Sequence, residues 1–304
     1  MYDGADDTSV TDTLAGRFEV HRAHARALAY RMLGSLAEAE DAVQESWLRL
    51  SRADGTTVTN LRGWLTTVVG RICLDMLRTR SSRREDPLDT FIPDPVITDI
   101  PSSDVRGPEA QALQAESVGL ALMVVLEELD PAERVAFVLH DVFDVPFDDI
   151  APIVERSTVA TRQLASRARR RIKDRAPVPD PDLRAQRRVV DAFLAAVERG
   201  DFEALLGILD PAVVLRADGG RAKGMSRIVR GASEVAAQAR AFSSMGLETT
   251  VVLVNGNVGV VARLPNGRVL SVIAYTVAND RVAAMHILAD AERLARLDTF
   301  ASSS

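Results

Sequence analysis

The sequence lacks the features of a disulfide-bonded, metal-binding or membrane-spanning protein. Cys73 is the single cysteine among 304 residues, which excludes intrachain disulfides and is typical of a reducing compartment. The four histidines show no metal-ligand spacing with Cys73, and we expect neither a metal site nor another cofactor. No apolar run reaches the roughly 18 residues of a membrane span, and the acidic, polar N-terminus is unlike a secretory signal peptide. We therefore expect a cytoplasmic protein without a membrane contact.

The charges are distributed in blocks, although the formal net charge is only −6. Segments 62–84 and 157–175 have net charges of +5 and +6, whereas segment 85–156 between them has −14. Salt screens charges beyond about 10 Å, so each block acts on what lies next to it. Two basic blocks on an acidic chain favour two separate contacts with a nucleic acid. The acidic block either discourages non-specific binding or meets a basic protein surface.

The second basic block belongs to a predicted helix-turn-helix. An apolar stripe predicts one short helix over Phe147–Val154. Ser157 or Thr158 can cap a second helix, which leaves a turn of only Glu155–Ser157. This spacing is typical of motifs that place their second helix in the DNA major groove.

The second helix separates apolar from cationic side chains. Steps of about 100° per residue put Ala160, Leu164 and Ala168 on the inner side, with Arg171 near it. Arginine reads guanine edges, glutamine reads adenine and hydroxyls bind phosphates, so the outer side is suited to DNA. The alternative is a solvated helix end whose cations suit the helix dipole. The predicted DNA contacts of the outer side are Thr158, Arg162, Gln163, Ser166, Arg169, Arg170 and Lys173.

Two proline-rich linkers divide the chain into three parts. Linkers 86–108 and 176–182 have compositions that cannot bury a core, and we expect them to be extended or disordered. The first two parts show helical periodicity and are predicted to be all-α. The third has three helices followed by four β-branched runs with Asn-Gly hairpin signals, which predicts an α+β unit. The predicted domains are therefore 13–85, 109–175 and 183–300.

Four ordered blocks carry a resemblance to a known family. They are 27–50 with its Asp-Ala-Val-Gln-Glu signature, 60–84, 126–151 and 155–173. Together they resemble an alternative sigma factor of the extracytoplasmic function (ECF) type. The resemblance implies a subunit that directs bacterial RNA polymerase to promoters, with one domain at the minus-10 element and one at the minus-35 element. It also implies that core polymerase, through its clamp helices and flap, and promoter DNA are the partners.

The same resemblance assigns roles to residues of the first helical part. Its acidic helix face would meet the clamp helices; for each of these residues the alternative is a solvated face. Segment 54–60 resembles the loop that captures a flipped minus-10 base. Trp64 is as well explained by a buried core position as by a DNA contact. The implied polymerase contacts are Glu40, Asp41, Gln44 and Glu45, and the implied minus-10 contacts are Asn60, Arg62, Trp64, Arg71, Arg78 and Arg80.

The third part resembles an NTF2-like, SnoaL-type cone fused to a sigma factor. Segment 216–223 resembles the Asp-Gly-Gly-Gly-Lys motif of the sigma subfamily that carries such a cone, with Arg221 in place of a glycine and Ala222 inserted. Segment 90–95 (TFIPDP) loosely resembles its linker motif. The fusion implies regulation within the chain, by docking or by a small ligand, in place of a membrane-bound anti-sigma partner. The predicted regulatory loop is Asp218, Gly219, Gly220 and Lys223, although the double glycine is also consistent with a simple turn.

Two other functions are consistent with parts of the sequence. The first is an NTF2-like enzyme with a DNA-binding appendage, in which Asp218, Lys223, Tyr275 and His286 would face one pocket. No acid and base pair has a persuasive spacing, so we expect no catalytic residue and no enzyme. The second is a one-component helix-turn-helix regulator that senses a ligand in the cone. It leaves the Asp41–Trp47 block unexplained.

Overall fold

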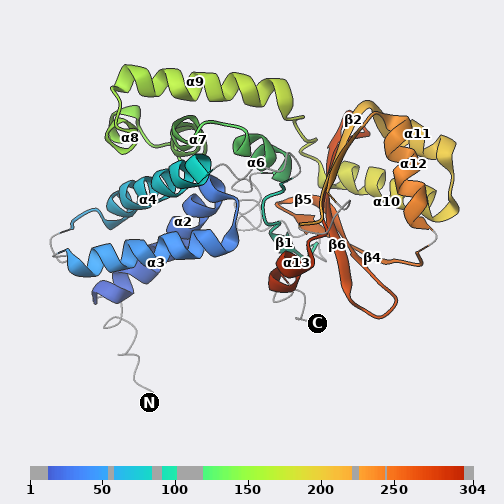
Figure 1. Cartoon of the computed structure of the whole chain (residues 1–304), viewed down its shortest axis with the longest axis horizontal. Helices are drawn as coiled ribbons and strands as arrows, with labels where there is room; N and C mark the ends of the chain where they lie inside the picture. The colour runs from blue at the N-terminus through green and yellow to red at the C-terminus, as the bar shows by residue number, and fades with distance from the viewer. Residues whose placement is uncertain are drawn as a thin grey trace, which may run out of the picture. The chain divides into compact units, whose positions relative to one another are not determined.

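The computed structural model shows two compact units (Figure 1). The helical unit is formed by Met1–Glu85 and Leu126–Asp174, and the sheet unit by Asp86–Val125 and Arg175–Ser304. The helical unit thus contains the first predicted domain and most of the second, whereas the first linker and the part of the second predicted domain before Leu126 belong with the C-terminal part. The domain boundaries themselves stay a prediction. The residues that the structure describes are 13–53, 58–83, 91–100, 119–220, 226–243 and 245–297.

Among the described residues, three helices form the N-terminal half of the helical unit. Side chains begin two of them, because Thr13 Oγ1 accepts from Gly16 N (3.0 Å) and Ser35 Oγ from Glu38 N (3.4 Å). Gly34, at φ 72°, ends the first helix and allows the next to begin two residues later. The helices are α2 (Leu14–Leu33), α3 (Leu36–Arg52) and α4 (Leu61–Arg83), in agreement with the predicted all-α class of this part.

The rest of the helical unit packs on α4. The helix of this segment begins at Pro131 after Asp130, positions whose residue types favour a helix start, and it widens into a π-helix at Val138. Gly70 of α4 lies against Ile153 and Leu139, since a Cβ added to it would meet their methyl groups at 3.3 and 3.6 Å. The elements of this half are α7 (Pro131–Phe137), η2 (Val138–Val142), α8 (Phe147–Val154) and α9 (Thr158–Arg175). Helix α6 (Leu120–Glu127) belongs up to Val125 to the sheet unit.

The sheet unit confirms the predicted α+β class. The three predicted helices are α10 (Leu183–Arg199), α11 (Phe202–Ile208) and α12 (Ala232–Ser243). The predicted meander is β4 (Glu248–Val254), β5 (Asn257–Arg263), β6 (Val269–Ala278) and β7 (Arg281–Leu288). The core lies between the three helices and one face of the sheet. Not predicted were β1 (Ile97–Thr98), β2 (Leu209–Asp218), β3 (Arg227–Arg230) and α13 (Ala291–Leu297), and the sheet order is β1-β4-β5-β6-β7-β2-β3.

The first linker differs from its prediction in segment 91–100. This segment is extended, as expected, but Ile92 is fully buried and β1 pairs with β4, so the prediction that it cannot bury a core was wrong there. Residues of the sheet unit provide hydrogen-bond partners for the backbone of this segment. Val96 N donates to Asn255 Oδ1 (3.0 Å), and Asn255 N donates to Val96 O (2.8 Å). Segments 84–90 and 101–118, including the predicted start of a helix at 109, lie outside the described residues.

Candidate nucleic-acid interface and linker clasp

The helix-turn-helix has the predicted turn. Helix α8 ends at Val154 and α9 begins at Thr158. Glu155 adopts a left-handed conformation, at φ 57°, which reverses the chain after α8. Ser157 caps α9, because its Oγ accepts from Ala160 N at 3.2 Å. The position of α9 is therefore determined by local capping as well as by packing.

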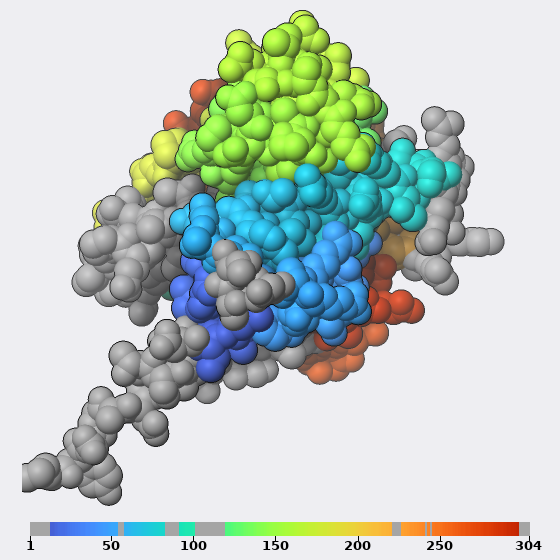
Figure 2. All heavy atoms as spheres, turned by 90° about the vertical axis from the view of Figure 1, so that its left-hand side faces the viewer, coloured from blue at the N-terminus to red at the C-terminus, as the bar shows by residue number. Residues whose placement is uncertain are grey.

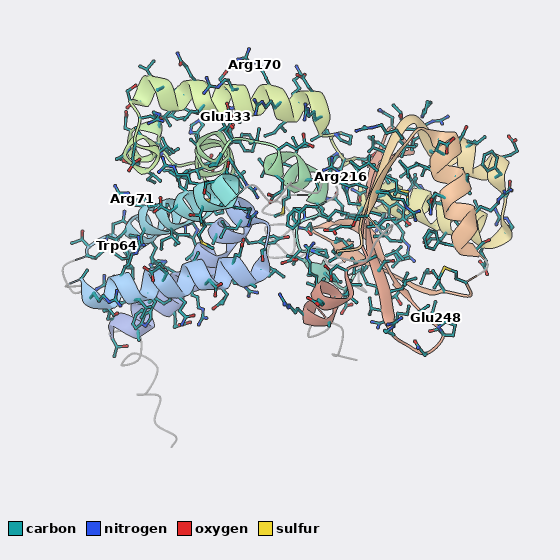
Figure 3. The ribbon with its side chains drawn as sticks, in the orientation of Figure 1. Trp64, Arg71, Glu133, Arg170, Arg216 and Glu248 are labelled. Carbon is teal, nitrogen blue, oxygen red and sulfur yellow. The ribbon has the colours of Figure 1, made fainter. Side chains whose placement is uncertain are left out.

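The inner side of α9 is slightly rotated from the prediction. Leu164 and Ala168 are buried, and Thr161 and Ala165 are fully buried beside them, while Ala160 is only half-buried. Arg170 lies on the opposite side and points away from the other helices of the unit (Figure 3). Gln163, Ser166, Arg170 and Lys173 are all exposed.

Three of the predicted contacts on α9 have neighbours within the unit. The Thr158 hydroxyl donates to Asp148 Oδ1 at 2.8 Å. Arg169 Nε donates to Asp141 Oδ1 at 2.6 Å, although the Arg169 side chain stays 45% exposed. The Arg162 guanidinium lies 5.7 Å from the centre of the Phe147 ring, which holds it by a cation–π contact. These contacts orient the side chains along the helix and leave the two guanidinium groups accessible.

Other cations of α9 serve packing. Arg167 Nε and Arg171 Nη1 donate to the two oxygens of the buried Glu133, at 2.8 and 3.1 Å. Glu133 lies between α9 and α7 (Figure 3). This agrees with the exclusion of Arg171 from the predicted DNA contacts.

The start of α4 places the first predicted minus-10 residues. Asn60 caps the helix, since its Oδ1 accepts from Gly63 N at 3.0 Å. Arg62 is exposed and Trp64 is half-buried, so neither the core nor the contact interpretation of Trp64 is excluded. Trp64 and Arg71 follow one another along α4 (Figure 3). Residues 54–57 of the predicted base-capturing loop lie outside the described residues.

The remaining minus-10 arginines are engaged by neighbouring elements. Arg71 Nη2 is 3.5 Å from Pro152 O, and Arg78 pairs with Glu155 Oε2 at 3.4 Å. Arg80 donates to Leu33 O at 3.3 Å and pairs with Glu38, as well as with Glu127 at 3.4 Å. Figure 2 shows the atoms of α8 and α9, in yellow-green, directly on those of α4, in cyan and light blue. These arginines are exposed in part, but each has a partner in the unit.

The acidic face of α3 is accessible only in part. Asp41 and Gln44 are exposed, whereas Glu40 pairs with Arg22, and Glu45 with Arg49 at 2.9 Å. Leu48 lies one helical turn after Gln44 and two turns after Asp41, and it is 38% exposed. Sequence reasoning missed this residue. A pocket of about 260 Å³ opens between α2 and α3, with Phe18, Val43 and Trp47 among its apolar lining and Arg22, Glu40 and Gln44 among its polar lining. The face thus combines charge with apolar surface.

The predicted regulatory loop begins at a buried carboxylate. Asp218, at the end of β2, is 3% exposed, and its Oδ1 accepts from Gly220 N at 3.0 Å. Its Oδ2 accepts from Ile92 N of the first linker at 3.2 Å. Gly219 N donates to Ser226 Oγ at 3.1 Å, and Gly220 has φ 61°. Lys223 lies outside the described residues.

Arg293 of α13 completes this arrangement, and sequence reasoning missed it. Its Nη1 donates to Asp218 Oδ2 (2.8 Å), its Nη2 to Asp94 Oδ1 (2.6 Å) and to Ile92 O (2.5 Å). Its guanidinium also lies 5.0 Å from the centre of the Phe91 ring. Figure 1 shows α13 beside β1. We call Phe91, Ile92, Asp94, Asp218 and Arg293 the linker clasp.

Two of the polar residues considered for catalysis, Tyr275 and His286, are not brought together. Tyr275 pairs with Met285, and His286 with Ala274, so Tyr275 and His286 lie on opposite faces of the sheet. Burial raises the pKa of the Tyr275 hydroxyl, which packs edge-on against Phe193 in the core. Burial, and to a lesser degree the charge of Arg216, lowers the pKa of His286 to about 3. In the part of the chain that the structure describes, no cluster of His, Cys, Asp or Glu could hold a metal ion, and no helix could cross a membrane.

The chain matches two family models, Sigma-70 region 2 over residues 18–83 and Sigma-70 region 4 over residues 119–172. It is 44% identical to the ECF RNA polymerase sigma factor SigJ of Mycobacterium tuberculosis over 223 residues, which are 72% of this chain and 69% of that protein. The probable ECF sigma factor SigI of the same species is 39% identical over 202 residues, 66% of this chain and 69% of the relative. The crystal structure of M. tuberculosis SigJ aligns with a TM-score of 0.72 and 35% identity, covering 92% of this chain and 98% of SigJ.

Proposed function

Since this chain belongs to the ECF family of alternative sigma factors, which direct bacterial RNA polymerase to promoters, we propose that α9 reads the minus-35 element. We further propose that α4, with the loop before it, binds the minus-10 element. The observation that carries the first proposal is the outer face of α9. Arg162, Gln163, Ser166 and Arg170 are exposed there, on a helix whose opposite face is buried. This arrangement is suited to a helix in the major groove.

Polymerase-dependent transcription tests the proposed function. The full chain is mixed with core RNA polymerase and a library of bacterial promoter fragments, and run-off transcripts are sequenced. We expect transcripts from a set of promoters that share two sequence elements at a constant spacing. Absence of any transcript that depends on the chain would contradict the function.

The proposed polymerase contact is the face formed by Glu40, Asp41, Gln44 and Glu45. Asp41 and Gln44 are exposed on one side of α3, and Leu48 continues the same line. A partner helix rich in arginine, such as a clamp helix, would be complementary to this line. Asp41→Arg should reduce co-purification with core polymerase, while Asp149→Arg, with the same charge change at an exposed position of α8, should not.

We propose that the linker clasp regulates the chain from within. Its three charged side chains are at most 18% exposed, and Arg293 joins the linker to the end of β2. Removal of one partner of a buried ion pair destabilises the fold strongly, because the other charge stays buried without compensation. The first linker connects the two promoter-binding parts along the sequence. The clasp holds this linker on the sheet unit. The alternative, a ligand in the sheet unit, would regulate without needing Arg293.

Arg293→Ala tests the clasp, with Arg296→Ala as the matched control. Arg296 is an exposed arginine of the same helix, one turn further on. We expect Arg293→Ala to increase amide exchange in segment 91–100 and to change run-off transcription several-fold. Equal transcription by both variants, with increased exchange only in Arg293→Ala, would remove the regulatory role from the clasp.

We propose no catalytic activity for the chain and a cytoplasmic location, where RNA polymerase works. The opposite orientation of Tyr275 and His286 supports the first proposal, because two groups on opposite faces cannot act on one substrate. Turnover of a carbonyl or epoxide substrate by the full chain would contradict it.

A further inference from the structure

The outer face of α9 contains an apolar side chain that no proposed contact uses. Val159 is the second residue of the helix, and it is 64% exposed. At about 100° per residue it lies about 20° from Ser166 on one side and about 20° from Arg170 on the other. Val159 is therefore in the middle of the polar face that we propose to enter the major groove.

The fold does not require a valine at this position. Its side chain belongs to no buried cluster of the helical unit, and β-branched residues have a lower helix propensity than alanine. Exposure alone has no functional meaning, since Val20 on α2 is equally exposed at 64%. Val159 differs from Val20 by its place, one turn before Arg162 and Gln163 on the outer face of α9.

Val159 is the first side chain of α9 that is available for a contact with DNA. The hydroxyl of the preceding Thr158 donates to Asp148 Oδ1 at 2.8 Å, so Thr158 is held against α8. Recognition helices contact base edges mainly with their N-terminal residues. In the major groove the apolar feature of a base pair is the C5 methyl group of thymine.

We propose that Val159 is a specificity-determining residue that contacts the C5 methyl group of one thymine in the minus-35 element. This inference depends on the proposed function of α9. The thymine read by Val159 is adjacent to the bases read by Arg162 and Gln163, because the three residues lie within two helical turns. Van der Waals contact between the valine and thymine methyl groups excludes water from both.

Replacement of thymine by deoxyuridine removes only this methyl group and provides the test. A minus-35 library is first selected with the full chain bound to core polymerase. Each thymine of the selected element, on either strand, is then replaced singly by deoxyuridine, and binding is measured with wild type, Val159→Ala, Val159→Thr and Val20→Ala. Val159→Thr keeps one methyl group and the β-branched shape, and Val20→Ala is the control for loss of an equally exposed valine.

We expect one thymine at which deoxyuridine weakens wild-type binding about fourfold, the effect of removing one buried methyl group. Val159→Ala should bind the thymine DNA about fourfold more weakly and should not respond to deoxyuridine there. Val159→Thr should keep part of the response, and Val20→Ala all of it. The inference is overturned if wild type responds at no position, or if Val159→Ala responds as wild type does. Absence of polymerase-dependent binding by wild type would instead overturn the proposed function.

Discussion

Helices α4 and α9 of the helical unit are both basic, but they present their arginines differently. On α9, Arg162 and Arg170 are exposed on the face away from the packed side. On α4, Arg71, Arg78 and Arg80 all contact other elements of the unit. A similar content of arginine therefore gives one helix with an accessible cationic face and one on which three arginines have partners in other elements; by our proposal these arginines exchange their partners for DNA. The comparison indicates that net charge along the sequence does not determine how accessible a basic helix is.

The largest expected effect is the loss of the accessible arginines on α9. We expect Arg162→Ala and Arg170→Ala each to cost roughly 1–3 kcal/mol of promoter binding where the residue reads a base. Binding of the chain with core polymerase is measured by fluorescence anisotropy on promoter and scrambled DNA. Arg171→Ala is the matched control, because Arg171 Nη1 is bound to Glu133 at 3.1 Å. Equal losses on scrambled DNA would make the two residues phosphate contacts.

The structural arginines of α9 should affect stability and not sequence preference. Glu133→Ala removes the buried carboxylate that accepts from Arg167 and Arg171. We expect the free energy of unfolding to fall by roughly 1–3 kcal/mol, since both hydrogen bonds are charge-assisted and the site is buried. Urea denaturation followed by circular dichroism measures the change. A variant with wild-type stability would show that α9 is held by its apolar side alone.

In the sheet unit, the charge of Arg216 acts on the buried, neutral His286. The pKa of His286 is lowered to about 3, by burial and by the charge of Arg216. The unfolded chain takes up a proton at His286 near pH 6.5, whereas the folded chain does not, so stability present above pH 6.5 is lost as the pH falls. From pH 7 to pH 5 we expect a loss of about 2 kcal/mol from this group.

His286→Gln should lack this part of the pH dependence. The free energies of unfolding of wild type and variant are compared by urea denaturation at pH 7 and pH 5. If both proteins lose the same free energy between the two pH values, the titration of His286 does not contribute.

The smallest expected effect concerns the pair between Arg78 and Glu155. The two side chains are 41% and 70% exposed, so the pair contributes less than about 1 kcal/mol. Glu155→Gln removes one of the two charged partners of Arg78, which keeps Asp75 at 3.7 Å, and should raise the affinity of the chain for minus-10 DNA by less than about fivefold. Asp149→Asn removes the same charge from an exposed position of α8 and is the control for a general electrostatic effect. An equal gain in both variants would show that Arg78 is not restrained by Glu155.

Local patterns explain which elements could be predicted. The period of α9 and the cap at Ser157 are properties of neighbouring residues, and the turn at Glu155–Ser157 followed from them. Asn255 and Gly256 have φ values of 48° and 75°, as a tight hairpin requires, so the β4–β5 hairpin was predictable. In contrast, β2 contains Pro211 and pairs in parallel with β7, about 70 residues away, which no local pattern indicates.

The candidate sites follow the same division. The outer side of α9 was predictable because the positions of its side chains depend only on the helical period. The partner of Arg169 was not, because Asp141 lies 28 residues earlier and meets it only after packing. Val159 was missed for a different reason: an exposed valine is recognised only when exposure is known.

The sequence by itself determined the family, the helix-turn-helix and the face of α9 that carries the cations, because motifs and helical periods are local. Tertiary structure decided which of these cations are accessible. It also decided that the linker is held by Arg293 and Asp218, residues 75 positions apart. The physical reason is that hydrogen bonds and ion pairs between distant residues form only after the chain has folded and has buried them, and neither composition nor spacing reports that burial.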